Sequence, residues 1–545
     1  MSLVIQFLSQ IRNFIRKQDG DSLQSWLQVG PNSPRQYHEL RAELRNQYRQ
    51  SGLDNIIQKC LPDDEGDEVE GEAVPWPSLV TFIKEYFTFW RDADYDVDLV
   101  RTHQLLSTLV SSCATALTHP AYGAMLLKTS MSLSDVLARL TMTLNRRPEL
   151  TRQLRTSNDD ESRKSIAESS AEIIQKIFTA CLNDRSSDRS SPPKGKRVAI
   201  YIFANLVLKL LFAYLRTHFL TCAVQCRRIH LAKMIFFNLG ANSPPLSLYP
   251  AAQRVTFLYY LGRFSFSSGN HYLRAANCLE AAYLQTPPRF TSHRTNILTY
   301  LIAANILLGR FPSANLLQRP ESRTLAPIFF PVCAALRSGD FIRFQAHLAE
   351  HEDWLLEKGL LVPLTHKLRP LLWRSLARKT FLLTYVPPTD AASRKAATLD
   401  VADLHTAAVY VQRRLEGWVP RPAGHAHQPN VNLLLMKALA NNIQETRGTS
   451  LVPPPGKPNR LRPNEGLVWG NAEVTLDHVE LQLATLVEEG LMHGFIAHGQ
   501  GRFAIIGAKA KGPVAAGWPS VWQSIQERRY EEDYNPDDVP GWVRV

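Results

Sequence analysis

The residues of this 545-residue sequence whose types and spacing could hold a metal ion lie in two short groups. In the first group, Cys222, Cys226 and His230 follow one another at intervals of four residues, so they share one face of a predicted helix. Two thiolates and an imidazole could supply three zinc ligands, but no fourth ligand lies nearby in the sequence. We therefore interpret these residues as buried thiols beside a histidine that faces a partner.

The second group is the pair His425 and His427. In the zinc motif of a metallo-isopeptidase, such a pair is followed about ten residues later by a serine and an aspartate. Residues 435 to 438 are Leu, Met, Lys and Ala, so we interpret the pair as part of an exposed loop. The sequence also contains no phosphate-binding loop, no nucleophile elbow and no HExxH zinc motif. We expect no enzymatic activity, no cofactor and no metal site.

Basic residues form two groups whose spacing suits binding. The first group could contact a phosphate backbone without reading base sequence, and it comprises Arg502, Lys509, Lys511, Lys457, Arg460 and Arg462. The second group lies in one apolar-rich stretch, and it comprises Arg369, Arg374, Arg378 and Lys379 together with Trp373 and Phe381. A solvated helix face and a docking surface for an acidic partner are both open interpretations of the second group.

The charge of the chain is concentrated in its middle. The net charge is +12. Residues 198 to 416 alone carry 25 basic and 11 acidic side chains, a local excess of +14. Such a positive field favours an acidic partner, either nucleic acid or an acidic protein. Seven cysteines without framework spacing argue against a secreted disulfide scaffold and favour a reducing compartment.

The elements that must position these residues are predicted to be helical almost throughout. From Val198 to Val386, apolar residues recur at helical spacing in paired segments, with Gly262, Ala275 and Ala276 where two helices would approach closely. This pattern predicts an all-α, tetratricopeptide-like helical repeat that forms a right-handed solenoid. Helices are expected over Phe290 to Leu308, Leu325 to Arg337, Phe341 to His351 and Leu399 to Val411.

The hydrophobic period changes near the C-terminal end. Val474 to Glu489 predicts an amphipathic helix that stops at Gly490. Two short strands follow, one through Phe495 and one from Arg502 to Ile506, joined at Gly499-Gln500-Gly501. Two helices followed by a glycine-tipped hairpin predict a C-terminal winged helix. The helix that precedes the hairpin carries Asp477, Glu480, Glu488 and Glu489, so we expect any nucleic-acid binding to be led by backbone contacts.

Two apolar stretches could be mistaken for targeting or membrane segments. The N-terminal stretch from Leu3 to Lys17 has no small-residue cleavage site and is predicted to be a docked amphipathic helix. Val198 to Val224 is interrupted by Lys209 and Arg216, so we predict a buried core helix and no membrane insertion.

Several runs of the sequence resemble the PCI domain family of helical-repeat and winged-helix scaffolds. They are YYLGRFSFSSGNHYLRAANCLEAAYLQTP (Tyr259 to Pro287), RTNILTYLIAANILLGRFPSANLL (Arg294 to Leu317), the stretch from Ala335 to Leu383, and VTLDHVELQLATLVEEGLMHGFIAH (Val474 to His498). Within the family the chain resembles the PCI-domain-containing subunit of the TREX-2 mRNA-export complex, a lineage known in fungi as signalosome-subunit-12-like. The match covers roughly residues 198 to 400 and 472 to 507.

The resemblance implies a function and partners. It implies a scaffold that pairs through its winged helix, at Phe495 and Ile496, with a second PCI-type subunit of the GANP/Sac type. It also implies a small acidic protein of the DSS/Sem type on the solenoid, RNA or double-stranded DNA on the basic winged-helix surface, and a place in the nucleus at the nuclear pore. A structural subunit of a signalosome-like or proteasome-lid-like assembly, without nucleic-acid binding, is the alternative.

These observations predict four segments. Residues 1–197 form a helical extension, 198–398 the PCI solenoid, 399–512 a winged helix with a long insertion at about 417–472, and 513–545 an acidic tail. The only cluster resembling a nuclear import signal is Lys194, Lys196 and Arg197, and it is weak.

Overall fold

The structure, a computed structural model, describes residues 2–48, 52–61, 76–147, 149–150, 165–185, 192–213, 222–268, 271–387, 396–420, 451–454 and 456–529. It divides into two compact units: unit 1 consists mainly of Met1–Asn270 and unit 2 mainly of Pro288–Asp538. Each unit is described by itself. The predicted pair His425 and His427 and the C-terminal part of the predicted acidic tail lie outside the described residues.

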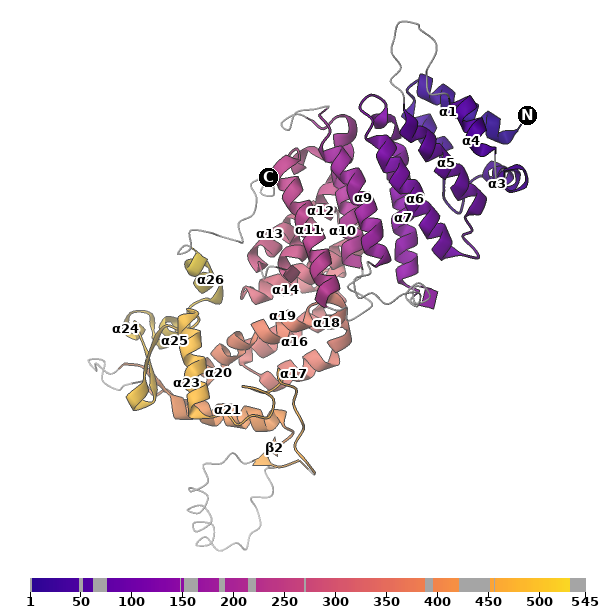
Figure 1. Cartoon of the computed structure of the whole chain (residues 1–545). Helices are drawn as coiled ribbons and strands as arrows, with labels where there is room; N and C mark the ends of the chain where they lie inside the picture. The colour runs from indigo at the N-terminus through magenta and orange to yellow at the C-terminus, as the bar shows by residue number, and fades with distance from the viewer. Residues whose placement is uncertain are drawn as a thin grey trace, which may run out of the picture. The chain divides into compact units, whose positions relative to one another are not determined.

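Unit 1 is helical throughout its described residues (Figure 1). Its elements are α1 (Leu3–Arg16), α2 (Gly20–Trp26), α3 (Arg35–Gln47), α4 (Leu53–Cys60), α5 (Pro77–Asp92), α6 (Leu99–Leu117), η1 (Gly123–Leu126), α7 (Leu127–Asn145), α9 (Ile166–Leu182), η2 (Gly195–Ala199), α10 (Ile200–Ala213), α11 (Cys222–Asn242), η4 (Leu246–Leu248) and α12 (Ala251–Ser268). The helix α13 (Tyr272–Gln285) contributes residues to both units.

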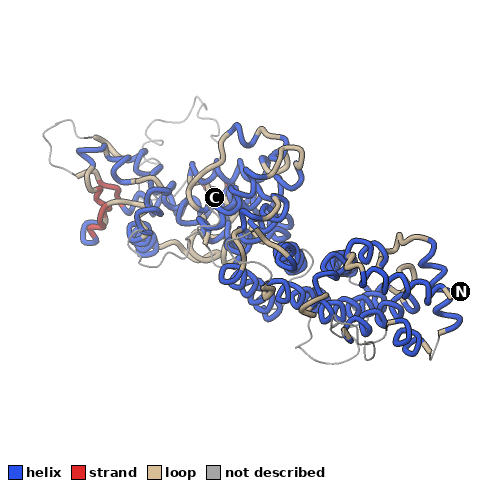
Figure 2. The backbone as a smooth tube through the Cα atoms, turned by 90° about the horizontal axis from the view of Figure 1, so that it is seen from above, coloured by secondary structure: helices blue, strands red, loops and turns tan. Residues whose placement is uncertain are grey.

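Unit 2 combines helices with two small sheets. Its elements are α14 (Thr291–Leu307), α15 (Ala314–Leu317), η5 (Pro320–Ser322), α16 (Ala326–Ser338), α17 (Phe341–Glu350), α18 (Glu352–Lys358), α19 (Leu361–Lys367), α20 (Arg369–Thr384), β1 (Thr398–Asp400), α21 (Val401–Leu415), β2 (Val419–Pro420), β3 (Leu451–Val452), α23 (Leu476–Glu488), β4 (Gly494–Ala497), η6 (His498–Gln500), β5 (Arg502–Ile505), α24 (Ala508–Lys511), α25 (Pro513–Gly517) and α26 (Val521–Arg529). Figure 2 shows how little of the chain is strand.

The N-terminal helix α1 is docked by its apolar face, as its pattern predicts. Phe7 is buried, and its ring stacks on Trp26 at 5.2 Å and on Tyr86 at 5.8 Å between centroids. Aromatic pairs at such distances add to the free energy gained from burial itself. This cluster joins α1 and α2 to α5.

The long apolar stretch after residue 197 is a core helix. In α10, Phe203, Val207 and Leu210 are fully buried, which confirms the prediction over Ile200–Ala213. This helix lies along α9, with α6 and α7 beyond it (Figure 1). Because α9 and α10 pack together, the predicted boundary at residue 197 runs through the interior of unit 1, and the compact units divide near α13 instead. None of the described helices meets the length and hydropathy that a membrane span requires.

The basic cluster before α10 is also part of the fold. Lys196 and Arg197 are each 8% exposed, and they donate to the main-chain carbonyls of His119 and Asp184 at 3.1 and 2.6 Å. These two side chains are therefore internal to unit 1, unlike the exposed cations that an import signal presents.

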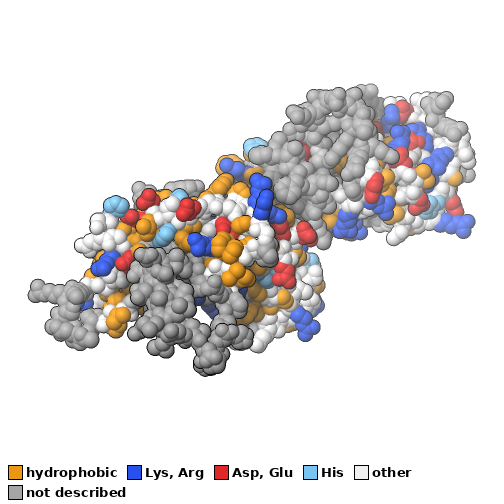
Figure 3. Space-filling model, turned by 90° about the horizontal axis from the view of Figure 1, so that it is seen from below, with side chains coloured by type: hydrophobic (Ala, Val, Ile, Leu, Met, Phe, Trp, Pro, Cys, Tyr) orange, Lys and Arg blue, Asp and Glu red, His pale blue; other side chains and the backbone are white. Residues whose placement is uncertain are grey.

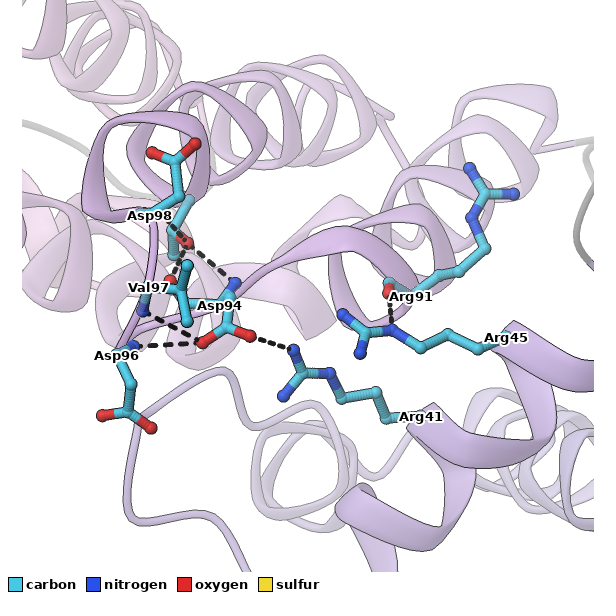
Figure 4. Close-up of polar contacts among 8 residues, drawn as sticks. Arg41, Arg45, Arg91, Asp94, Asp96, Val97 and Asp98 are labelled. Atoms are coloured by element: carbon cyan, nitrogen blue, oxygen red, sulfur yellow. Dashed lines mark hydrogen bonds and ion pairs between the residues drawn. The ribbon is translucent and has the colours of Figure 1, made fainter.

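A polar network ties α3 to the turn between α5 and α6 (Figure 4). The carboxylate of Asp94 accepts a hydrogen bond from the main-chain N–H of Asp96 at 3.1 Å and from the Arg41 guanidinium at 2.9 Å. These two donors stabilise the charged form and lower the pKa of Asp94. Arg45 donates to the main-chain carbonyl of Arg91 at 2.7 Å, so two arginines of α3 hold this turn.

A buried histidine joins three helices of unit 1. His103 of α6 is 6% exposed, and its Nε2 lies 3.1 Å from the hydroxyl of Thr141 on α7 and 3.0 Å from that of Ser170 on α9. Burial disfavours the charged imidazolium and lowers the pKa of His103 to about 4.

This burial predicts acid sensitivity. The unfolded chain, with a histidine pKa of about 6.5, binds more protons than the folded chain as the pH falls from there towards 4, so the free energy of unfolding falls by about 1.4 kcal/mol per pH unit. Urea unfolding followed by circular dichroism at about pH 7 and about pH 5 measures the loss. The variant His103→Gln lacks this proton uptake and is expected to lose about 2 kcal/mol less over that interval. Equal losses in both proteins would contradict the assignment.

The repeat helices of unit 2 match the predicted ones. The pattern predicts helices over Phe290 to Leu308, Leu325 to Arg337 and Phe341 to His351, and the structure has α14, α16 and α17 there. Gly339 ends α16 with φ at +66°, and a Cβ at this position would lie 2.6 Å from the main-chain nitrogen of Leu376 on α20. Only glycine therefore allows α16 and α20 to approach so closely.

The winged helix is formed by α21, α23 and a three-stranded antiparallel sheet of order β1-β5-β4. The predicted hairpin is confirmed as β4 and β5, which pair Phe495 with Ala504 and Ile496 with Phe503. The prediction of a helix from Leu399 is wrong in its first residues, because Thr398–Asp400 forms β1 and pairs with β5. The helix α21 then starts at Val401.

The insertion and the tail contain more structure than their composition predicts. Within the insertion, β3 pairs with β2 in a two-stranded sheet. The first part of the predicted acidic tail is α25 and α26, and Trp518 between them is 5% exposed against Phe381 at 5.0 Å. Residues 513 to 529 therefore belong to unit 2 rather than to a tail.

Candidate interaction surface on the winged helix

Two half-buried arginines attach the winged helix and the insertion to the last repeat helix, α20. Arg374 donates to the main-chain carbonyl of Leu491 at 3.0 Å and to that of Pro519 at 2.5 Å. Arg369 donates to the carbonyl of Asn464 at 2.6 Å and to that of Leu467 at 2.8 Å, and it also bonds Gly466. Burial lowers the pKa of Arg374 to about 10 and lowers the pKa of Arg369.

These contacts correct the prediction that this stretch docks an acidic partner. The guanidinium groups of Arg369 and Arg374 are used inside the unit, where carbonyl oxygens take the place of water. The two aromatic side chains of the same prediction are internal as well. Trp373 is 2% exposed against Phe341, and Phe381 is fully buried against Trp518.

What remains exposed on α20 is its outer face and its end. Arg378 and Lys379 are exposed, and they make no ion pair within the described part of the chain. Leu383 near the end of α20 and Val386 just after it are 78% and 82% exposed. A docking surface at this helix and its end would therefore use exposed side chains such as these four, and not Arg369, Arg374, Trp373 or Phe381.

The six predicted phosphate-binding cations divide into paired and unpaired ones. Arg462 pairs with Glu352 at 2.6 Å, and this hydrogen bond raises the pKa of Arg462. Arg502 lies 3.9 Å from Asp400 across the β1–β5 pair. Carboxylates thus compete with a phosphate for both guanidinium groups.

The other four cations, Lys457, Arg460, Lys509 and Lys511, are exposed and have no ion-pair partner among the residues that the structure describes. Lys509 and Lys511 lie on the short helix α24 directly after β5. Lys457 and Arg460 lie in the inserted segment that Arg369 and Glu352 hold to α20 and α18. Of these four cations, Lys509 and Lys511 on α24 are therefore the ones that follow the winged-helix sheet most directly.

The winged helix also exposes several large apolar side chains. The strand β4 is at the edge of its sheet, so one row of its main-chain groups is not used within the sheet. Phe495 on this strand is 56% exposed, and Ile496 is half-buried. Leu481 on α23 and Ile506 after β5 are 61% and 47% exposed. We call the edge of β4 with Phe495, Leu481 and Ile506 the wing edge.

Sequence analysis found Phe495 and missed Leu481 and Ile506. The position of Leu481 in the helical repeat could have shown its exposure. Val479, Leu483 and Leu486 form the buried stripe of α23, and Leu481 lies outside that stripe. Ile506 ends the run of β5 after the buried Ile505 and so points away from the core.

The tip of the hairpin is held by a polar contact. The ring of His498 lies 2.6 Å from the carboxylate of Glu480 on α23, and this carboxylate raises the pKa of His498. On the face of the molecule in Figure 3, acidic and basic side chains lie interspersed among apolar ones. The exposed edge of β4 thus suits the binding of an extended segment of another chain.

The architecture is that of a helical-repeat scaffold that ends in a winged helix. No protein-family model matches the chain. It is 26% identical over 381 residues to a PCI domain-containing protein of Schizosaccharomyces pombe, covering 70% of this chain and 78% of that protein. It is 27% identical over 246 residues to the PCI domain-containing protein 2 homolog of Drosophila melanogaster, covering 45% of this chain and 54% of that protein.

A further relative is the protein CSN12 homolog of Schizosaccharomyces pombe, which is 30% identical over 276 residues, covering 49% of this chain and 60% of that protein. The chain thus spans somewhat more than half the length of these last two relatives. With its repeat helices and winged helix, the chain is similar to proteins named PCI domain-containing and to CSN12 homologs, in line with the resemblance in its sequence.

The hydrogen bonds of Arg374 predict how the winged helix is held. The variant Arg374→Met keeps most of the side-chain volume but leaves the carbonyls of Leu491 and Pro519 without their donor, which costs about 2 kcal/mol or more. Hydrogen exchange of the β4 and β5 amides is expected to accelerate accordingly. The exposed Arg378→Met, one helical turn away, is the matched control and is expected to change stability by less than about 0.5 kcal/mol. Equal exchange in the two variants would show that Arg374 does not hold the winged helix.

Proposed function

We propose that this chain is a non-enzymatic scaffold subunit of a PCI assembly, that this assembly is the TREX-2 transcription-coupled mRNA-export complex, and that the winged helix pairs with a second PCI-type subunit there. The observation that carries the proposal is the wing edge. An unpaired edge strand that also exposes an aromatic side chain is a ready template for a strand of another chain.

The partner follows from the same surface. A second winged helix of the PCI type offers an equivalent edge strand, and Phe495, Leu481 and Ile506 supply apolar area around the paired strands. By resemblance this partner is a GANP/Sac-type scaffold. The exposed side chains Arg378 and Lys379 at the outer face of α20 are the remaining candidates for contact with a small acidic protein of the DSS/Sem type.

Nucleic-acid binding is the second part of the proposal. Lys509 and Lys511 lie one turn beyond β5, so a phosphate backbone could run beside the wing edge while the edge itself is occupied by protein. Such contacts bind RNA or double-stranded DNA without reading base sequence. Location in the nucleus at the nuclear pore is part of this proposal and rests on the resemblance.

A structural subunit of a signalosome-like or proteasome-lid-like assembly is the second candidate. Two observations favour it: Arg462 and Arg502 are engaged with carboxylates, which weakens the basic surface, and several relatives are named CSN12 homologs. In this case the wing edge would still bind a PCI-type chain, and the lysines of α24 would bind no nucleic acid.

Charge reversal separates the two candidates. For the double variant Lys509→Glu with Lys511→Glu, we expect weaker binding to a single-stranded RNA and a shallower dependence of log affinity on log salt, by about 1.4 in slope for two lost phosphate contacts. Fluorescence anisotropy over a series of salt concentrations measures both quantities.

The matched control is the double variant Arg323→Glu with Lys367→Glu, which makes the same change of charge at two exposed positions, one in the turn before α16 and one in α19. It is expected to keep the salt slope of the wild type. Equal slopes in wild type and in the α24 variant would remove these lysines from the mechanism and favour the structural subunit.

A further inference from the structure

Two histidines and a glutamate meet at the junction of α17 and α18. His347 and Glu350 lie in the last turn of α17, and His351 follows directly. At spacings of three and four residues, all three side chains project from the same side of the helix end. One ligand atom of each residue lies within 4.8 Å of the others.

The ring of His347 is held by a hydrogen bond in the way that is usual for histidines that bind metals. Its Nε2 lies 2.8 Å from the main-chain carbonyl of Ile328 on α16. Because a carbonyl oxygen only accepts hydrogen bonds, Nε2 carries the proton and Nδ1 keeps its lone pair. That lone pair belongs to the nitrogen 3.9 Å from the Glu350 carboxylate. A histidine that donates its second N–H to a carbonyl is the usual arrangement around protein-bound metals.

The three groups need little movement to close around an ion. Nitrogen and oxygen ligands at about 2.0 to 2.1 Å in a tetrahedral site lie about 3.4 Å from one another. The side chain of Glu350 is 72% exposed and free to rotate, whereas that of His347 is 12% exposed and fixed. The His351 ring is 4.5 Å from the His347 ring between centroids, already beside it.

We propose that His347, Glu350 and His351 bind one divalent transition-metal ion of the zinc class, with water completing the coordination. Two imidazoles and one carboxylate suit zinc, cobalt or nickel, and the two nitrogen ligands disfavour magnesium and calcium, which bind oxygen.

The ion would stiffen a junction that the fold already uses. The next residue, Glu352, begins α18 and pairs with Arg462 of the insertion at 2.6 Å. An ion on His351 would therefore fix the main chain immediately before the carboxylate that anchors the insertion. This inference requires no particular assembly and is independent of the proposed function.

Cobalt is the probe, because its absorption reports the ligand type. The full-length chain, freed of metal, is titrated with Co²⁺ and the visible spectrum is recorded. We expect one ion per chain with the d–d bands of a nitrogen and oxygen site and without the charge-transfer band that thiolates give, which separates this site from any of the seven cysteines.

The variants His351→Ala and Glu350→Gln are expected to weaken Co²⁺ binding at least about tenfold, since the loss of even an outer-shell partner costs that much. They leave the His347 bond to Ile328 intact and so do not disturb α16. His366→Ala, at an exposed histidine of α19, is the control and is expected to bind as the wild type does. Absence of the d–d bands at micromolar Co²⁺, or equal binding by all variants, would overturn the proposal.

Discussion

The structure of unit 2 depends on two half-buried arginines whose partners, among the residues that the structure describes, are main-chain carbonyls and not carboxylates. Arg374 extends from α20 into the winged helix and is solvated there by two main-chain carbonyls, those of Leu491 and Pro519, while Arg369 does the same for the insertion. Removing a guanidinium from water costs free energy unless its N–H groups donate hydrogen bonds to other acceptors. Removing the carbonyls from water costs free energy unless they accept hydrogen bonds from other donors. Each side of the contact therefore requires the other, and the repeat helix and the winged helix form one unit.

This attachment determines what the winged helix can present. With its inner side fixed by Arg374 and by the packing of Phe381 on Trp518, the sheet leaves the edge of β4 and the turn of α24 outward. Lys509 and Lys511, two of the unpaired cations, lie on α24 directly after β5, whereas Arg502 lies near Asp400. The two proposed kinds of binding use different groups. Strand pairing with a protein would use the main chain of β4. Contact with a phosphate would use the side chains of Lys509 and Lys511.

The sequence predicted the elements better than the contacts. Helical periodicity located α14, α16, α17 and α23, and the glycines after α16 and within the hairpin marked their ends, because these signals are local. The roles of Arg369 and Arg374 were not predictable, since their acceptors are main-chain carbonyls more than ninety residues away in the sequence. Every residue type has such a carbonyl, so the sequence does not show which one accepts the hydrogen bond. The strand β1 was missed for the same reason, because its partner β5 is distant in sequence. Lys509, Lys511 and Phe495 were named from the sequence and are exposed in the structure, since exposure follows from pattern.

The most direct test of the wing edge as an assembly surface compares the proteins that bind the wild-type chain in the cell with those that bind a wing-edge variant. The tagged chain and its Phe495→Asp variant are purified from the cells that produce the protein, and the co-purifying chains are identified by mass spectrometry. Phe495 is 56% exposed, so the substitution leaves the fold intact. A second PCI-type chain is expected with the wild type and is expected to be lost with the variant. Retention of that chain by the variant, or its absence from the wild-type purification, would contradict the wing edge as the assembly surface.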